Sequence, residues 1–124
     1  GMSGPVPPFH RRRNGKMGVI TDTIRMQYLN NVKLDLEYKI QLVTQARMGL
    51  SQSASDLMQV GTDYSPDSPV VKQLNQRQAK LKVLEQKLEQ QMIQYQTRLQ
   101  MVSTELEACR SRLNSSIGRA FSYG

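Results

Sequence analysis

The sequence of 124 residues has no tryptophan, two phenylalanines, one histidine and one cysteine. A single cysteine, Cys109, excludes a disulfide within the chain and a four-cysteine zinc site. No apolar run approaches the ~20 residues that span a bilayer. The apolar fraction, 38%, is below the ~45–50% typical of globular domains. These absences exclude a disulfide-stabilised scaffold and a membrane-spanning chain, and they argue against a large globular enzyme.

The net charge of +7 is concentrated near the N-terminus. Residues 1–16 contain Arg11, Arg12, Arg13 and Lys16 with no acidic residue, whereas residues 17–97 are almost neutral. Proline and glycine are frequent in residues 1–16, so residues 1–20 are predicted to form a flexible basic arm. Such an arm is either a solvated tail or a surface for phosphate backbones and anionic lipid. The second interpretation makes these four residues candidates for nucleic-acid or anionic-surface binding.

A heptad pattern begins after the arm and predicts a helix over residues 21–60. Thr21 or Asp22 is a suitable N-cap, and Gly61 is a suitable C-terminal stop. The spacing of seven places the apolar residues on one helical face. The row consists of Leu29, Leu36, Val43, Leu50 and Leu57.

Residues 61–68 have the composition of a turn, and a second helix is predicted over residues 69–118. Ser68 before Pro69 is typical of an N-cap followed by the first helical position. Two heptad rows follow, four residues apart. The first row is Leu74, Leu81, Leu88, Tyr95, Val102 and Cys109, and the second is Met92, Leu99, Leu106 and Leu113. Residues 119–124 are expected to form a short tail.

Two long helical patterns joined by a short turn predict an all-α antiparallel hairpin, similar to a coiled coil. The turn places Leu29 opposite Val102 and Leu50 opposite Leu81. Cys109 sits in an apolar row, so we expect it to be a small buried side chain rather than a reactive thiol. On this register the second helix projects ~10 residues beyond the start of the first.

The apolar surface of the second helix is wider than a two-stranded contact needs, and a hairpin alone would be marginally stable. We therefore expect self-association, most simply a dimer that forms a four-helix bundle, or binding to another helical protein. Alternatively, the same residues complete a core within the chain, with the arm folded back. The candidate contact residues are Leu99, Leu106, Leu113, Ile117 and Phe121.

No catalytic, cofactor-binding or metal-binding residues are predicted. The one histidine, His10, lies in the basic arm, and no nucleotide-binding glycine motif occurs. Asp63 and Asp67 resemble the start of a calcium loop, but the position for its bidentate glutamate is Leu74. The sequence therefore favours a non-enzymatic protein without a cofactor that acts through protein contacts.

The plan of residues 20–118 resembles the small bacterial secreted hairpins of the WXG type, with two helices, one turn and no enzyme chemistry. Gly61-Thr62-Asp63-Tyr64 occupies the turn, where that family has its W-x-G motif. The plan is also similar to needle subunits and export chaperones of type III secretion. The resemblance implies a bacterial secretion-associated protein. The expected location is cytoplasmic, with export by a leaderless route as the alternative.

Overall fold

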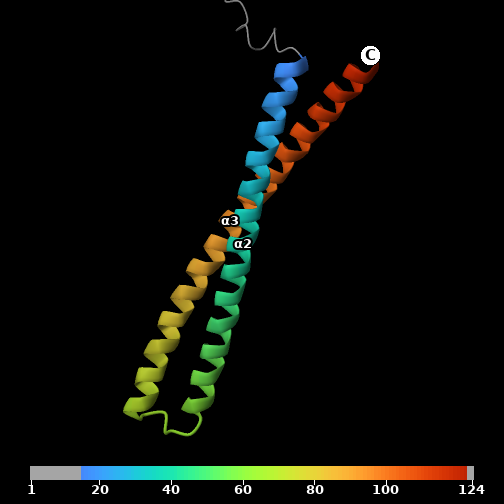
Figure 1. Ribbon diagram of the computed structural model, residues 1–124. Helices are drawn as coiled ribbons and strands as arrows, with labels where there is room; N and C mark the ends of the chain where they lie inside the picture. The colour runs from blue at the N-terminus through green and yellow to red at the C-terminus, as the bar shows by residue number, and fades with distance from the viewer. Residues whose placement is uncertain (1–14, 123–124) are drawn as a thin grey trace, which may run out of the picture. The chain divides into compact units, whose positions relative to one another are not determined.

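Two long helices make up the part of the chain that the structure describes. The computed structural model describes the backbone of residues 15–122 and the side chains of residues 16–119. Helix α2 comprises Gly15–Gly61 and helix α3 comprises Pro69–Ser122, with no strand among these residues (Figure 1). The helices run antiparallel and pack against each other. The predicted all-α helical hairpin is confirmed.

Both helices extend beyond their predicted outer ends. The predicted start at residue 21 is wrong, because α2 begins at Gly15 and Asp22 is buried inside the hairpin rather than capping the helix. Helix α3 continues to Ser122 instead of ending at residue 118. Gly118 lies in open space, and a single glycine costs a helix only about 1 kcal/mol, which does not force an end.

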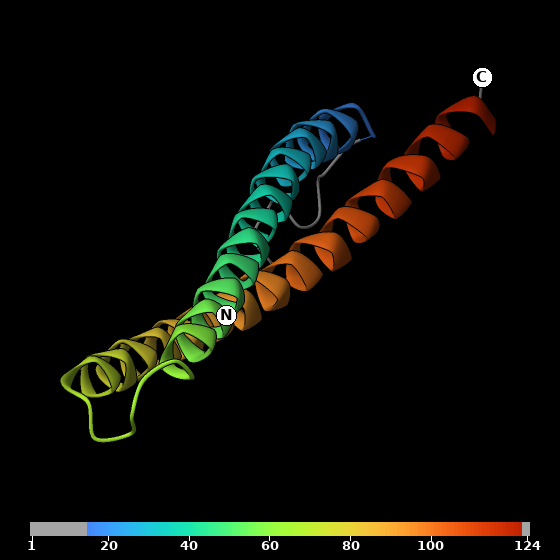
Figure 2. The ribbon, with the colours of Figure 1, turned by 90° about the horizontal axis from the view of Figure 1, so that it is seen from below.

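The inner ends of the helices agree with the prediction. Helix α2 ends at Gly61, and α3 begins at Pro69 after Ser68, whose hydroxyl accepts a hydrogen bond of 3.1 Å from the Val70 amide. Backbone hydrogen bonds three residues apart close the turn, including Tyr64 to Gly61 at 3.3 Å. No described glycine has a positive φ, so Gly61 ends the helix without a left-handed cap. Figure 2 shows this turn from below.

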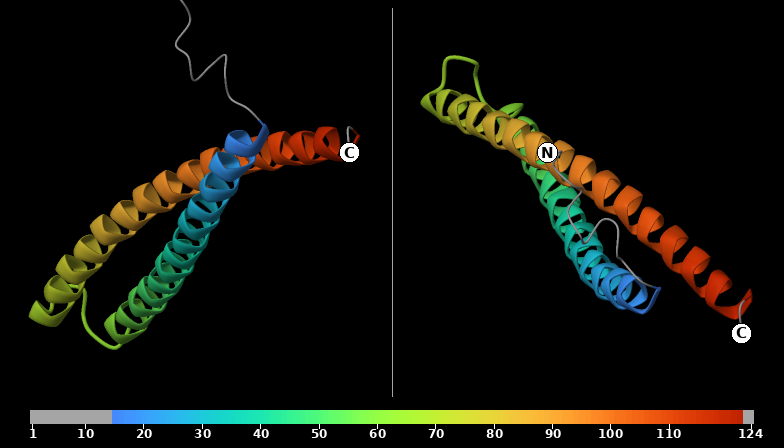
Figure 3. Two further views of the ribbon diagram at one scale, coloured as in Figure 1. Left: turned by 45° about the horizontal axis from the view of Figure 1, so that its top comes forward. Right: turned by 90° about the horizontal axis from the view of Figure 1, so that it is seen from above.

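The hairpin divides into two compact units that each contain part of both helices. Among the described residues, unit 1 contains residues 15–34 and 100–122, and unit 2 contains Asp35–Leu99 with the turn. The prediction of one hairpin domain did not include this division. Figure 3 shows that, within unit 1, the first turns of α2 and the last turns of α3 diverge toward their ends.

Unit 1 has a closed apolar cluster. Leu29, Leu106 and Cys109 are its buried members, and Met26 and Val102 pack against them. Val102 packs against the cluster that contains Leu29, in agreement with the predicted register, and Cys109, with no exposed surface, is the expected buried small side chain. Burial of this kind stabilises a chain by roughly 25 cal/mol per Å² of apolar surface.

Unit 2 has fewer buried side chains along a longer stretch of helix. Leu36 and Val43 of α2 and Met92 of α3 are its buried members. The Lys39 ammonium lies 5.9 Å from the centre of the Tyr95 ring, across the two helices. These contacts hold the helices together at the end of unit 2 that lies away from the turn.

Candidate interaction surfaces

An exposed ion pair joins the two helices of unit 1. Arg25 Nε donates a hydrogen bond of 2.9 Å to Glu105 Oε1, and its Nη2 contacts the same oxygen. Because Arg25 donates these hydrogen bonds, its pKa lies above the ordinary arginine value. The guanidinium also lies 5.5 Å from the centre of the Tyr28 ring. The pair links α2 to α3 on the surface of unit 1.

A second pair lies further along unit 1 and includes the one buried charged residue of the described chain. Asp22 is 4% exposed, and its Oδ1 accepts hydrogen bonds of 3.3 Å from Arg112 Nε and Nη2. Nη2 also lies 3.0 Å from Cys109 Sγ. The hydrogen bond to Asp22 is the main reason that the pKa of Arg112 is raised. A thiol with no exposed surface is inaccessible to reagents, so this cluster is structural.

The role of Asp22 was missed because acidic residues near a helix start are usually caps. One signal could have revealed it: Asp22 lies seven residues before Leu29, in the same heptad row as the core. A carboxylate in such a row needs a cationic partner from the facing helix.

The predicted contact residues of α3 are found in different environments. Leu106 is buried inside the cluster of unit 1, so its side chain is used within the hairpin. Leu99 and Leu113 are half-buried, and Ile117 is 40% exposed. Phe121 lies in α3, and its side chain is outside the described residues. The structure thus places one of the five in an intramolecular core and leaves Ile117 on the surface.

The overhang of α3 is shorter than predicted. The predicted register places Gly15 opposite Ser116, so α3 projects six residues, 117–122, beyond the first residue of α2 instead of about ten. The start of α2 therefore accompanies Leu113, whereas Ile117 and Phe121 lie in the projecting part of α3, and the two helices diverge toward these ends (Figure 1).

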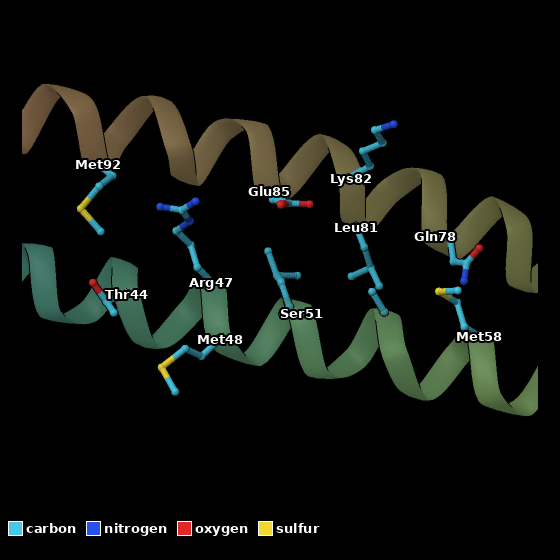
Figure 4. Close-up of a pocket in the computed structure, with 12 residues that line it drawn as sticks. Thr44, Arg47, Met48, Ser51, Met58, Gln78, Leu81, Lys82, Glu85 and Met92 are labelled. Carbon is cyan, nitrogen blue, oxygen red and sulfur yellow. The ribbon is translucent and has the colours of Figure 1, made fainter.

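Unit 2 contains an open groove between its helices, shown in Figure 4. Thr44 and Met92 point toward one another across it, and Arg47 points from α2 toward α3. Apolar heptad residues of both helices in this region remain half-buried rather than buried. They are Leu50, Leu57, Leu74, Leu81 and Leu88.

Polar residues in the heptad rows explain the groove. Gln78 and Glu85 lie fourteen and seven residues before Met92, in the second heptad row of α3, and both line the groove. Arg47 lies seven residues after the half-buried Ile40 of α2 and lines the groove as well. These side chains keep access to water, so the helices of unit 2 do not close over their leucines.

The remaining predictions concern the basic residues near the N-terminus, metal binding and membrane spans. Lys16 is exposed in the first turn of α2, whereas Arg11, Arg12 and Arg13 lie outside the described residues. Within the described residues, no group of three or more histidine, cysteine, aspartate or glutamate side chains could hold a metal ion. No helix in that same part of the chain has the length and apolar character needed to cross a membrane.

Comparisons with known proteins found no counterpart: no family model, no curated protein and no solved structure matches the chain. The buried clusters of the two helices and the surfaces that they leave exposed are therefore the features that bear on function.

Proposed function

We propose that the chain is a non-enzymatic helical hairpin that acts as a protein-interaction module by self-association, with a dimer that forms a four-helix bundle as the simplest assembly. The apolar side chains that α2 leaves exposed within one hairpin carry this proposal. A heptad row that stays partly in water within one hairpin gains free energy when another helix covers it. Binding of a different helical protein is the closest variant of the same mechanism.

The charge distribution is compatible with self-association. Unit 2 contains eight basic and seven acidic residues, so two copies of it meet without strong mutual repulsion. Helix α2 leaves several apolar side chains exposed, and Ile24, Leu34, Tyr38 and Met48 are among them. Exposed apolar side chains that lie close together on one helix face are typical of interaction sites.

The alternative function is binding to nucleic acid or an anionic surface through Arg11, Arg12, Arg13 and Lys16. The concentration of positive charge in residues 1–16 is the observation in its favour. This function makes a different prediction about salt, because contacts to phosphates weaken steeply as the salt concentration rises. Association of apolar helix faces does not weaken in this way.

Light scattering after size exclusion tests the proposal on the full chain at low and high salt. We expect a dimer at both salt concentrations. A parallel titration with a labelled mixed-sequence DNA duplex tests the alternative. A monomeric chain that binds the duplex at low salt and releases it at high salt would overturn self-association and support the basic arm.

A further inference from the structure

Helix α2 carries a second row of uncharged residues that the hairpin does not use. The row alternates steps of four and three residues, the spacing of positions a and d in a coiled coil. Residues 20–48 contain seven charged side chains, and none of them lies in this row. We name it the outer stripe; it consists of Ile20, Ile24, Gln27, Asn31, Leu34, Tyr38, Gln41, Gln45 and Met48.

The outer stripe lies on the side of α2 opposite to the side that packs on α3. With ~3.5 residues per turn, its two rows are centred about 180° from the row of Leu29, Leu36 and Val43. Its apolar members are well exposed in each unit taken separately. Leu34 is 65% exposed in unit 1, and Met48 is 68% exposed in unit 2.

We infer that the outer stripe is the dimer contact, and that α2 of one copy packs on α2 of a second copy in parallel and in register. This inference rests on the proposed self-association and specifies the surface that performs it. The two α2 helices are then the inner pair of four helices that lie side by side, in place of a bundle around one common core. The helix α3 lies on the opposite side of α2, so it leaves this contact accessible.

The chemistry of the stripe favours a second copy as the occupant. An uncharged stripe can face itself without like-charge repulsion. In-register parallel pairing also places every apolar side chain on an apolar one and every amide on an amide. Asn31 falls at an a position, where a single asparagine pairs with its equivalent and specifies the register of parallel dimers.

The residues flanking the stripe are also compatible with this arrangement. In a parallel pair, a g residue faces the e residue five positions later on the other helix. Asn30 then faces Asp35 of the second copy, and Glu37 faces Leu42 of the second copy. No pair of like charges is created, and Leu42, which is 46% exposed in one hairpin, gains cover.

Antiparallel pairing fits the stripe less well. The arrangement that covers its centre pairs Leu34 with Tyr38, and it brings Asp35 to Asp35 and Glu37 to Glu37 across the two-fold axis. A shifted arrangement pairs Ile20 with Tyr38 and avoids that repulsion, but it leaves Met48 uncovered. Parallel pairing covers the whole stripe and brings no like charges together.

Cysteine cross-linking of the full chain tests the orientation. Parallel in-register pairing places the two Ile20→Cys thiols within disulfide reach, whereas both antiparallel arrangements separate them. Ile93→Cys on α3 is the matched control, since Ile93 is 56% exposed and Ile20 is 53% exposed. Cys109 is buried, so the unchanged chain gives the background.

Under mild oxidation we expect a covalent dimer with Ile20→Cys and only background with Ile93→Cys. Absence of the Ile20→Cys dimer, or equal cross-linking at both positions, would overturn the inference.

A charge substitution separates failure of this inference from failure of the proposed function. Leu34→Lys introduces two facing ammonium groups into the contact, and we expect dimerisation to weaken at least tenfold. Val83→Lys, at a position 51% exposed on α3, is the control, and we expect it to remain dimeric. Circular dichroism verifies that both variants keep their helix content.

If Leu34→Lys remains as dimeric as the unchanged chain, the outer stripe is not the contact, although self-association stands. A monomeric unchanged chain would overturn both.

Discussion

The two units of the hairpin share one heptad pattern, yet their helices pack differently. Unit 1 has a closed cluster around Leu29 and Leu106, with ion pairs from Arg25 and Arg112 across the helices. In unit 2, the described residues 35–99 contain no ion pair across the helices, and an open groove lies between them. The comparison shows that a heptad repeat specifies helices and register, whereas close packing depends on which side chains occupy each row.

Truncating one core leucine in each unit tests this comparison with the largest expected effect. Leu29→Ala should lower the free energy of unfolding by about 2–5 kcal/mol, because Leu29 is 2% exposed and a cavity would remain. Leu50→Ala should cost about 1 kcal/mol, since its side chain is half-buried beside an open groove. Urea unfolding followed by circular dichroism measures both. Equal losses would mean that the two units are packed equally well.

Adding a large apolar side chain to each unit should have opposite effects. Cys109→Leu should lower the free energy of unfolding by about 1–3 kcal/mol, because Cys109 is fully buried and a larger side chain must displace its neighbours. Glu85→Leu should raise the free energy of unfolding by up to about 1 kcal/mol, because the substitution places an apolar side chain in the heptad row that borders the groove. The midpoint of thermal unfolding distinguishes the two. A destabilising Glu85→Leu would contradict the explanation given for the groove.

The buried carboxylate of unit 1 gives a smaller effect. Arg112→Gln removes the cross-helix hydrogen bonds to Asp22, and the expected loss is about 1 kcal/mol, because the arginine side chain is 50% exposed. Arg110→Gln is the matched control: it removes a pair with Glu107 within one helix and should cost at most about 0.5 kcal/mol. If urea unfolding shows similar losses in the free energy of unfolding for both variants, the structural role assigned to Asp22 is wrong.

The smallest effect concerns two glycines, one in each unit. Gly49 in unit 2 and Gly118 in unit 1 lie within helices, and a Cβ on either would meet nothing within 4 Å. Alanine should therefore stabilise the chain by about 0.5–1 kcal/mol at each position, because glycine loses more backbone entropy on folding. Thermal unfolding measures the gain. A lower unfolding temperature for Gly49→Ala alone would show that a neighbouring group packs closely against Gly49 and leaves no room for a Cβ.

The sequence predicted the features that depend on repeat and turn chemistry. The two helices, the turn, and the packing of Val102 against the cluster that contains Leu29 followed from the spacing of seven and from Gly61 and Pro69. These features are local, or they follow from local ones through the length of the turn, so a single sequence contains them.

The remaining features depend on how the two helices meet. The early start of α2 and the burial of Asp22 could not be predicted from a capping pattern, because Arg112 supplies the partner from ninety residues away. The groove was missed although Gln78 and Glu85 interrupt the heptad row in the sequence. The outer stripe could not be recognised from apolar spacing alone, because four of its nine residues are amides, Gln27, Asn31, Gln41 and Gln45.

The mass of the full chain in solution, measured by light scattering beside Leu34→Lys and Val83→Lys, tests the central proposal most directly. We expect twice the chain mass for the unchanged protein and for Val83→Lys, and a mass shifted toward that of a single chain for Leu34→Lys at the same concentration. A single chain mass for the unchanged protein would contradict self-association.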